Sequence, residues 1–234
     1  LYEDGNGWYR KCFEWREQDK VATLVFDGIY MDSTFYINGE PAFEWKYGYS
    51  AITLDITPFL KQGENEIMIK VAFRSPNSRW YSGAGIYRDV WFVVTQPTYI
   101  RENDIYVTSK RQGDDFVLTV ESPVQKGAES VVENRLLDKA GEGVELQLLS
   151  QETGTCNKSG VRCFIQKYLV KSPRLWDVED ACLYTLLTQL VHNGEKVQEI
   201  RQQIGFREIA FDSRKGFFLN GVHIKLNGVC EHHD

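Results

Sequence analysis

Alternation of apolar and polar residues is the dominant pattern in the first hundred positions, and it predicts short β-strands. In residues 66–73, isoleucine, valine and phenylalanine occupy every second position, which is the period of a half-buried strand. One helical turn is predicted between two strands, with Thr57 as its N-cap and Pro58 at its first position. No window keeps the 3.6-residue apolar period of a helix over three turns, so this region is predicted to be all-β. Alternation also predicts strands at residues 8–15 and 90–94, a nearly continuous apolar run predicts one at residues 21–26, and residues 34–37 form a short run before a hairpin signal.

The same pattern continues beyond Gln96-Pro97-Thr98, a short segment that we interpret as a linker. Short strands separated by polar turns over about 100 residues are typical of an immunoglobulin-like β-sandwich. The Cys…Trp…Cys spacing of antibody domains is absent, as in many sandwiches outside that group. The strands predicted here are residues 105–109, 116–121, 130–137, 144–149, 162–170, 183–191 and 196–203.

Asn-Gly pairs mark the predicted hairpins. Asn38-Gly39, Asn193-Gly194 and Asn220-Gly221 each separate two apolar runs. Both central residues of a type I′ turn need a positive φ, which Asn and Gly tolerate. After the third pair the chain runs through residues 222–226 and ends in Val-Cys-Glu-His-His-Asp. We interpret this end as the first strand of a further, truncated domain.

Composition narrows the classes of function. The 234 residues are 42% hydrophobic and 13% aromatic, as in a globular protein, and carry a formal net charge of −6. No basic cluster suits nucleic acid, and no apolar stretch approaches the roughly 18 residues of a membrane span. Five cysteines without a C-x-x-C pair argue against a disulfide framework and against a zinc site. Cys156 and Cys163, which flank a short polar loop, are the pair that an oxidising compartment would bridge.

Several motifs together resemble glycoside hydrolase family 2. In that family, a segment similar to GFREIAFD…GFFLNGVHIKLNGVCEHHD (residues 205–234) leads from an immunoglobulin-like domain into a catalytic (β/α)8 barrel. The middle domain of the family has a segment similar to SPRLWDVEDACLYTL (residues 172–186), more often with proline where this chain has Ala181. The family's jelly-roll sugar-binding domain has successive parts similar to GWYRKCFEW, FDGIYMDSTFYINGE, LDITPFLKQGENEIMIKV and NSRWYSGAGIYRDVWF.

The resemblance implies three parts. Residues 1–97 are expected to form a jelly-roll sugar-binding domain that is incomplete at its N-terminus, and residues 98–204 an immunoglobulin-like β-sandwich. Residues 205–234 are expected to begin a (β/α)8 barrel that is cut after its first strand. The fold class is therefore expected to be all-β up to that strand.

The resemblance also implies that the parent protein is a retaining glycosidase of the β-galactosidase type. Such a reaction uses two carboxylates roughly 5–5.5 Å apart. In the family both are glutamates on later barrel strands, so no catalytic residue is assigned in this chain. The chain is expected to be inactive by itself, and neither a metal nor a cofactor is expected.

Five residues are candidates for contact with the sugar. The family places a histidine near the sugar at the position of His232, at the C-terminal end of a barrel strand where active sites lie. His233 is a second candidate, although adjacent strand residues point to opposite faces. Asn77, Trp80 and Tyr81 belong to a polar, aromatic loop that reaches the active site in some family members. Those members have a carboxylate there and this chain has none, so the resemblance does not carry over a sodium or galactose contact.

Other aromatic and basic residues have structural interpretations. Tyr87 is an exception, because its aromatic ring, like those of Trp80 and Tyr81, is of the kind that stacks on sugars. Trp8, Trp45 and Trp91 are predicted to fill a core or to pack between domains, because aromatic side chains commonly fill sandwich cores. Arg88-Asp89 and Arg207 are predicted to form ion pairs at domain junctions.

The function expected is therefore that of part of an enzyme that hydrolyses terminal β-glycosides of oligo- or polysaccharides. Its expected partner is a carbohydrate, with neither nucleic acid nor membrane. The alternatives are a stand-alone carbohydrate-binding module and a β-sandwich interaction protein. Within the enzyme interpretation, β-glucuronides and β-mannosides are the alternative substrates. The oligomeric state is left open, as is the compartment, for which bacterial periplasm and cytoplasm both fit.

Overall fold

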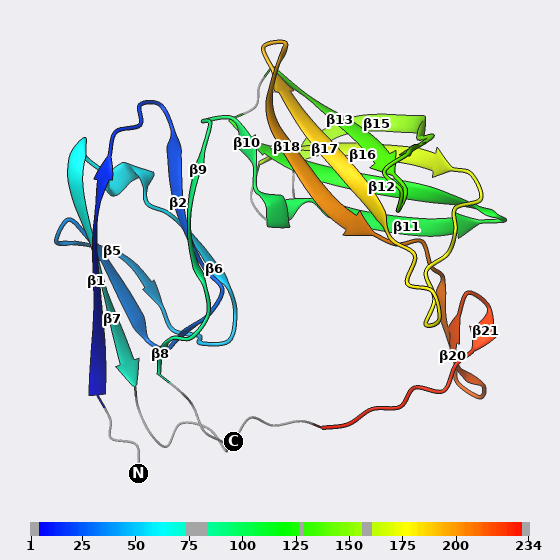
Figure 1. The fold of residues 1–234 in the computed structure, drawn as a ribbon, viewed down its shortest axis with the longest axis horizontal. Coiled ribbons are helices and arrows are strands. Elements are labelled where there is room, and N and C mark those ends of the chain that lie inside the picture. The colour runs from blue at the N-terminus through cyan, green and yellow to red at the C-terminus, as the bar shows by residue number, and fades with distance from the viewer. Residues whose placement is uncertain (1–4, 74–83, 127–128, 156–160, 231–234) are drawn as a thin grey trace. The chain divides into compact units, whose positions relative to one another are not determined.

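The computed structural model describes residues 5–73, 84–126, 129–155 and 161–230 (Figure 1). Strands make up nearly all of the regular structure, and the only helical elements in these ranges are two short 3-10 turns. The predicted all-β class is thereby confirmed. The chain divides into two compact units that adjoin in sequence at Pro97 and Thr98. No helix in the described residues is long and apolar enough to cross a membrane.

The first unit is a β-sandwich built from antiparallel strand pairs. Its strands are β1 (Gly5–Trp15), β2 (Val21–Phe26), β3 (Ile29–Tyr30), β4 (Ser33–Ile37), β5 (Glu40–Trp45), β6 (Ile52–Asp55), β7 (Gly63–Phe73), β8 (Gly85–Ile86) and β9 (Val90–Thr95). One sheet has the order β1-β7-β4-β5, the other has β6-β2-β9, and β3 pairs with β8. As a result, β1 and β9 are edge strands.

The core of the first unit follows the predicted alternation. On β7, the side chains at 65, 67, 69 and 71 are buried while the residues between them are half-exposed. Ile67 and Ile69 pack with Leu24 and Phe26 of the opposite sheet in one apolar cluster. Burying each such side chain contributes about 1.5–3 kcal/mol, so period-two patterning holds the two sheets together.

The predicted helical turn is present as η1 (Thr57–Phe59), but the predicted cap is wrong. The N-cap is Ile56, and no side chain caps the turn. The Thr57 hydroxyl accepts a hydrogen bond from the backbone N–H of Ala22 at 2.9 Å, and Asp55 Oδ1 accepts one from the Thr57 N–H at 3.0 Å. Thr57 therefore joins the turn to β2, which its own sequence neighbours do not indicate.

The second unit is a larger β-sandwich. It comprises β10 (Tyr99–Ile100), η2 (Glu102–Asp104), β11 (Tyr106–Gln112), β12 (Asp115–Gln125), β13 (Ser130–Leu137), β14 (Gly143–Val144), β15 (Gln147–Thr155), β16 (Arg162–Val170), β17 (Tyr184–His192) and β18 (Glu195–Ile204). One sheet has the order β10-β12-β16-β15, with β11 also on β12, and the other has β14-β13-β17-β18. Phe116, Tyr184 and Phe206 meet edge to face in the core between them.

One predicted strand of this unit is wrong in its extent. Residues 144–149 were expected to form a single strand, but they contribute to both β14 and β15. β14 pairs with β13 in one sheet, whereas β15 pairs with β16 in the other. The chain passes from one sheet to the other at Glu145-Leu146, and a strand cannot stay continuous across that step.

The three Asn-Gly hairpins are confirmed. Asn38-Gly39, Asn193-Gly194 and Asn220-Gly221 all have positive φ at both residues, between 51° and 84°. The last of them joins β20 (Gly216–Leu219) to β21 (Val222–His223), in a small sheet that also contains β19 (Ile209–Asp212). The predicted run over residues 222–226 is shorter than expected, and residues 224–230 form no strand. The predicted first barrel strand therefore stays a prediction.

Candidate functional site

All five predicted sugar contacts lie outside the described residues. These are Asn77, Trp80, Tyr81, His232 and His233. The chemistry of the first unit must therefore be judged from the described residues, where two features stand out: an apolar cleft and a cluster of tyrosines. In the described ranges, no group of three or more His, Cys, Asp or Glu residues could hold a metal ion.

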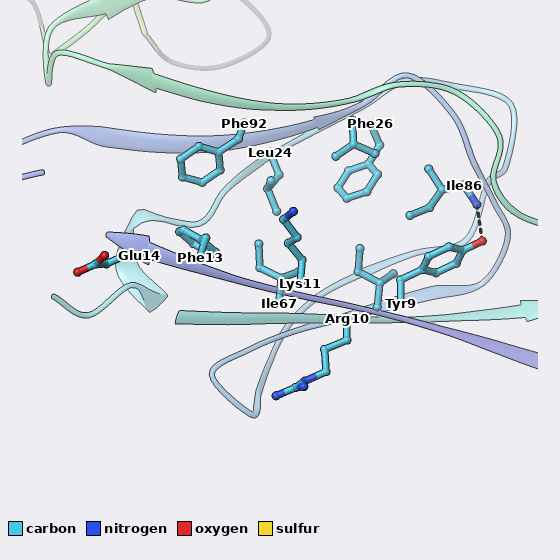
Figure 2. A pocket seen from close by; sticks show the side chains of 12 residues that line it. Tyr9, Arg10, Lys11, Phe13, Glu14, Leu24, Phe26, Ile67, Ile86 and Phe92 are labelled. Atoms are coloured by element: carbon cyan, nitrogen blue, oxygen red, sulfur yellow. Dashed lines mark hydrogen bonds between the residues drawn. The ribbon is translucent and has the colours of Figure 1, made fainter. Parts of the chain in front are cut away.

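The apolar cleft lies between the edge strands β1 and β9 and has a volume of about 620 Å³ (Figure 2). Lys11 extends into the cleft, whereas Arg10 points away from it. Arg10 is paired with Glu66, and that hydrogen bond raises the pKa of the guanidinium. Most of the lining is apolar and includes Phe13, Leu24, Phe26, Ile67 and Phe92.

The lining of the cleft does not suit a sugar. A saccharide needs several polar groups placed to meet its hydroxyls, because each buried hydroxyl without a partner is unfavourable. The Tyr9 hydroxyl, which faces the cleft, already accepts a hydrogen bond from the Ile86 N–H at 3.2 Å (Figure 2). Of the other charged lining residues, Glu14 is paired with Arg16 at 2.6 Å, and Lys11 extends among apolar side chains. The cleft is therefore a poor candidate for the predicted sugar contact.

The tyrosine cluster consists of Tyr30, Tyr47, Tyr49 and Tyr87. Tyr49 contacts Tyr30 edge to face with ring centroids 5.1 Å apart, and it contacts Tyr47 in the same way at 5.7 Å. Tyr30 is buried and anchors the cluster, whereas Tyr47 is 60% exposed and Tyr49 54%. The Tyr87 hydroxyl donates a hydrogen bond to the carbonyl oxygen of Gly48 at 2.8 Å. One buried ring and one hydrogen bond thus hold a pair of exposed rings.

Two glycines allow the tyrosines to approach the backbone so closely. A Cβ at Gly48 would lie 2.0 Å from the Tyr30 ring, and one at Gly28 would lie 2.5 Å from the Tyr87 ring. A side chain at either position would therefore have to displace the neighbouring tyrosine ring. In the sequence, the alternation Tyr47-Gly48-Tyr49 was the available signal, but Tyr87 was the one residue of this cluster predicted to suit a sugar.

The three tryptophans predicted to pack inside differ from one another. Trp45 is half-buried and packs against the core, as predicted. Trp8 and Trp91 are more than half exposed in their unit. The Trp91 indole N–H donates to Asp27 Oδ2 at 3.0 Å, so its polar edge is satisfied at the surface. A core role is therefore wrong for Trp8 and Trp91, and their packing between domains stays a prediction.

Within its own unit, neither Arg88 nor Arg207 forms an ion pair with a described residue, and ion pairs at the domain junctions stay a prediction. Both guanidinium groups instead lie over aromatic rings. Arg88 lies 5.5 Å from the centre of the Tyr87 ring, and Arg207 lies 4.9 Å from that of Trp176. A planar guanidinium is weakly hydrated and stacks well on an aromatic face, which explains this alternative.

Comparison with known proteins identifies both units. Residues 2–97 match the family model described as glycosyl hydrolases family 2, sugar binding domain, and residues 98–207 match the model described as glycosyl hydrolases family 2. A beta-galactosidase of Bacteroides ovatus, BoGH2A, is 37% identical over 239 residues, which cover 98% of this chain and 28% of that protein. A beta-glucuronidase of Bacteroides fragilis is 31% identical over 258 residues, which cover 100% of this chain and 36% of that protein.

Solved structures agree with these sequence comparisons. A glycosyl hydrolase family 2 member from Bacteroides cellulosilyticus superposes with a TM-score of 0.86 at 32% identity, covering 98% of this chain and 30% of that one. The chain thus spans about a third or less of the proteins that it resembles in structure and sequence. Two models of one family match its two units in succession, and the chain belongs to glycosyl hydrolases family 2.

Proposed function

We propose that this chain is the non-catalytic portion of a retaining glycoside hydrolase that acts on terminal β-galactosides of oligo- or polysaccharides. One observation carries the proposal: a protein named beta-galactosidase aligns with 98% of the chain at 37% identity. In this proposal, residues 1–97 are the sugar-binding domain, residues 98–204 the immunoglobulin-like domain, and residues 205–234 the start of the catalytic barrel.

The proposal gives the five candidate residues a role in the intact enzyme. His232 and His233 would stand at the mouth of the barrel, and Asn77, Trp80 and Tyr81 would border the substrate from the sugar-binding domain. Replacing His232 with alanine in the intact enzyme is expected to lower kcat/KM for an aryl β-galactoside. Unchanged kinetics would remove His232 from the site.

The 234-residue chain is expected to have no glycosidase activity of its own. Retaining hydrolysis needs a nucleophile and an acid/base held on opposite sides of the glycosidic bond, and the family resemblance places both on later barrel strands. The experiment compares the purified chain with the intact gene product on 4-nitrophenyl β-galactoside. Hydrolysis by the intact protein alone supports the proposal, and turnover by the chain above background contradicts it.

β-Glucuronides are the second candidate substrates, because one relative at 34% identity is named "Putative beta-glucuronidase" and another at 31% identity is named beta-glucuronidase. A glucuronide carries a carboxylate where a galactoside carries a hydroxymethyl group, so the matching site needs a cation. The intact protein should be assayed on 4-nitrophenyl β-galactoside and 4-nitrophenyl β-glucuronide side by side. A higher kcat/KM for the glucuronide would replace the galactoside in the proposal.

A further inference from the structure

Tyr47 and Tyr49 place two large aromatic rings at the surface of the first unit. Their exposed fractions are 60% and 54%. Among the described residues, neither hydroxyl has a hydrogen-bond partner. Exposed aromatic side chains that lie side by side commonly mark a place where a ligand or partner binds. Packing in the core of the sandwich therefore does not explain why these two rings lie together at the surface.

The cluster is held firmly from below. The Tyr30 ring packs on Gly48 and contacts Tyr49, and the Tyr87 hydroxyl is bonded to the Gly48 carbonyl. Tyr87 directly follows β8, where the Tyr9 hydroxyl accepts the hydrogen bond of Ile86 (Figure 2). A ring that is already fixed loses little conformational entropy when a ligand binds, so this cluster is organised in advance of binding.

We infer that Tyr47 and Tyr49 form a binding site for the pyranose rings of a polysaccharide. An aromatic face matches the apolar C–H face of a pyranose, and the free phenol hydroxyls reach its hydroxyl groups. The two rings are inclined at 68° with centroids 5.7 Å apart, so a sugar stacked on one ring meets the edge of the other. The positively charged side chains of Lys46 and Arg88 are exposed beside the cluster and offer further hydrogen-bond donors to a sugar.

A carbohydrate fits this surface better than an apolar partner. Tyrosine combines an apolar face with a polar tip, whereas an apolar partner would leave the hydroxyls of Tyr47 and Tyr49 without bonds. The cleft between β1 and β9 has the opposite character, because most of the side chains that line it are aliphatic or phenylalanine. These residues also lie within 2–97, the range matched by the sugar-binding model. The choice of galactose as the sugar rests on the proposed function.

The test uses the 234-residue chain and two named probes, soluble β-1,4-galactan and lactose. Affinity electrophoresis in gels containing galactan measures retardation, and calorimetry with lactose measures the affinity for a short ligand. Tyr47→Ala and Tyr49→Ala are each expected to weaken galactan binding by about tenfold, the effect of losing one aromatic contact. Tyr47→Phe, which keeps the ring and removes the hydroxyl, is expected to lose less.

Tyr106→Ala is the matched control, because Tyr106 is 61% exposed and lies on β11 of the second unit. It should bind galactan like the wild type. Equal thermal midpoints for all variants establish that they fold. The inference is overturned if the wild-type chain is not retarded by galactan, or if Tyr47→Ala and Tyr49→Ala bind like Tyr106→Ala.

Failure of this inference differs from failure of the proposed function. If the intact enzyme hydrolyses aryl β-galactosides while the tyrosine variants bind galactan normally, only the binding site is wrong. If the variants lose galactan binding but the intact enzyme has no galactosidase activity, the binding site stands and the proposed function is wrong.

Discussion

Asn65 provides a sharp test of how the first unit is held together. It is 1% exposed, at the start of β7. Its Oδ1 accepts hydrogen bonds from the Lys61 N–H and from Asn38 Nδ2, each at 2.9 Å. Its Nδ2 donates to the carbonyl oxygens of Lys61 at 2.7 Å and Gly63 at 2.9 Å. This one amide therefore ties the Asn38-Gly39 hairpin to the loop before β7.

Asn65→Asp keeps the shape of the side chain but replaces the donor with an acceptor. Two hydrogen bonds are lost, each worth about 0.5–1.5 kcal/mol, and a buried carboxylate oxygen is left against two carbonyl oxygens at a further cost of about 1–3 kcal/mol. We expect the free energy of unfolding of the first unit to fall by about 3–5 kcal/mol at neutral pH.

The loss should also depend on pH. Burial and the two carbonyl oxygens raise the pKa of the introduced carboxyl in the folded state above its unfolded value. The destabilisation is then fully present well above the folded pKa. It shrinks as the pH falls from the folded pKa towards the unfolded pKa near 4, and it vanishes below that value, where the group is protonated in both states. Hydrogen exchange of the β4 and β7 amides, measured at neutral pH and at about pH 4.5, reports the stability of the first unit independently of the second.

Asn6→Asp is the matched control, because Asn6 is exposed on β1 and the change adds the same charge. It should leave exchange unchanged. The reasoning is refuted if Asn65→Asp is as stable as Asn6→Asp at neutral pH, or if its deficit does not shrink on acidification.

Three further outcomes are expected. Hydrogen bonds led by that from Gln189 lower the pKa of Glu199 from 4.5 to about 2. NMR titration should find this pKa. The stability that Glu199 contributes above pH 4.5 should be lost as the pH falls through about 2, and the Glu199→Gln variant should lack this pH-dependent contribution. Phe206→Ala should lower the stability of the second unit by about 3–5 kcal/mol in urea, whereas Phe211→Ala, 79% exposed, should stay within about 0.5 kcal/mol; equal losses would contradict the core assignment. Gly48→Ala places a Cβ 2.0 Å from the Tyr30 ring and should lower the thermal midpoint. An unchanged midpoint would show that the tyrosine rings move aside without loss of stability.

Local patterns predicted the strands well where one sheet accounts for the whole segment. The predicted ranges 21–26, 130–137 and 162–170 coincide with β2, β13 and β16. The three Asn-Gly turns were predicted equally well, because a positive φ is a preference of the residues themselves. Residues 144–149 were predicted wrongly because their alternation does not reveal that the chain changes sheets at this point.

The tyrosine cluster illustrates the same limit for the candidate site. Tyr87 was recognised as an aromatic suited to sugars, but Tyr47 and Tyr49 were not. They are joined by contacts with Tyr30 and Gly48 that depend on the packing of separate segments. No local pattern states that a tyrosine 39 positions away in sequence will bond to the Gly48 carbonyl.

The sequence by itself determined the β-strands, their tight turns and the family motifs. Each of these is a local property of the chain. Side chains alternate along a strand, and the preference for a positive φ belongs to a single residue. The tertiary structure decided which buried polar groups find hydrogen-bond partners. Asn134 Nδ2 donates to Gln166 Oε1 at 2.7 Å, and the Thr188 hydroxyl donates to Asn134 Oδ1 at 2.7 Å. These residues lie on β13, β16 and β17 of two facing sheets, so their bonds exist only once the sheets have packed and water has left.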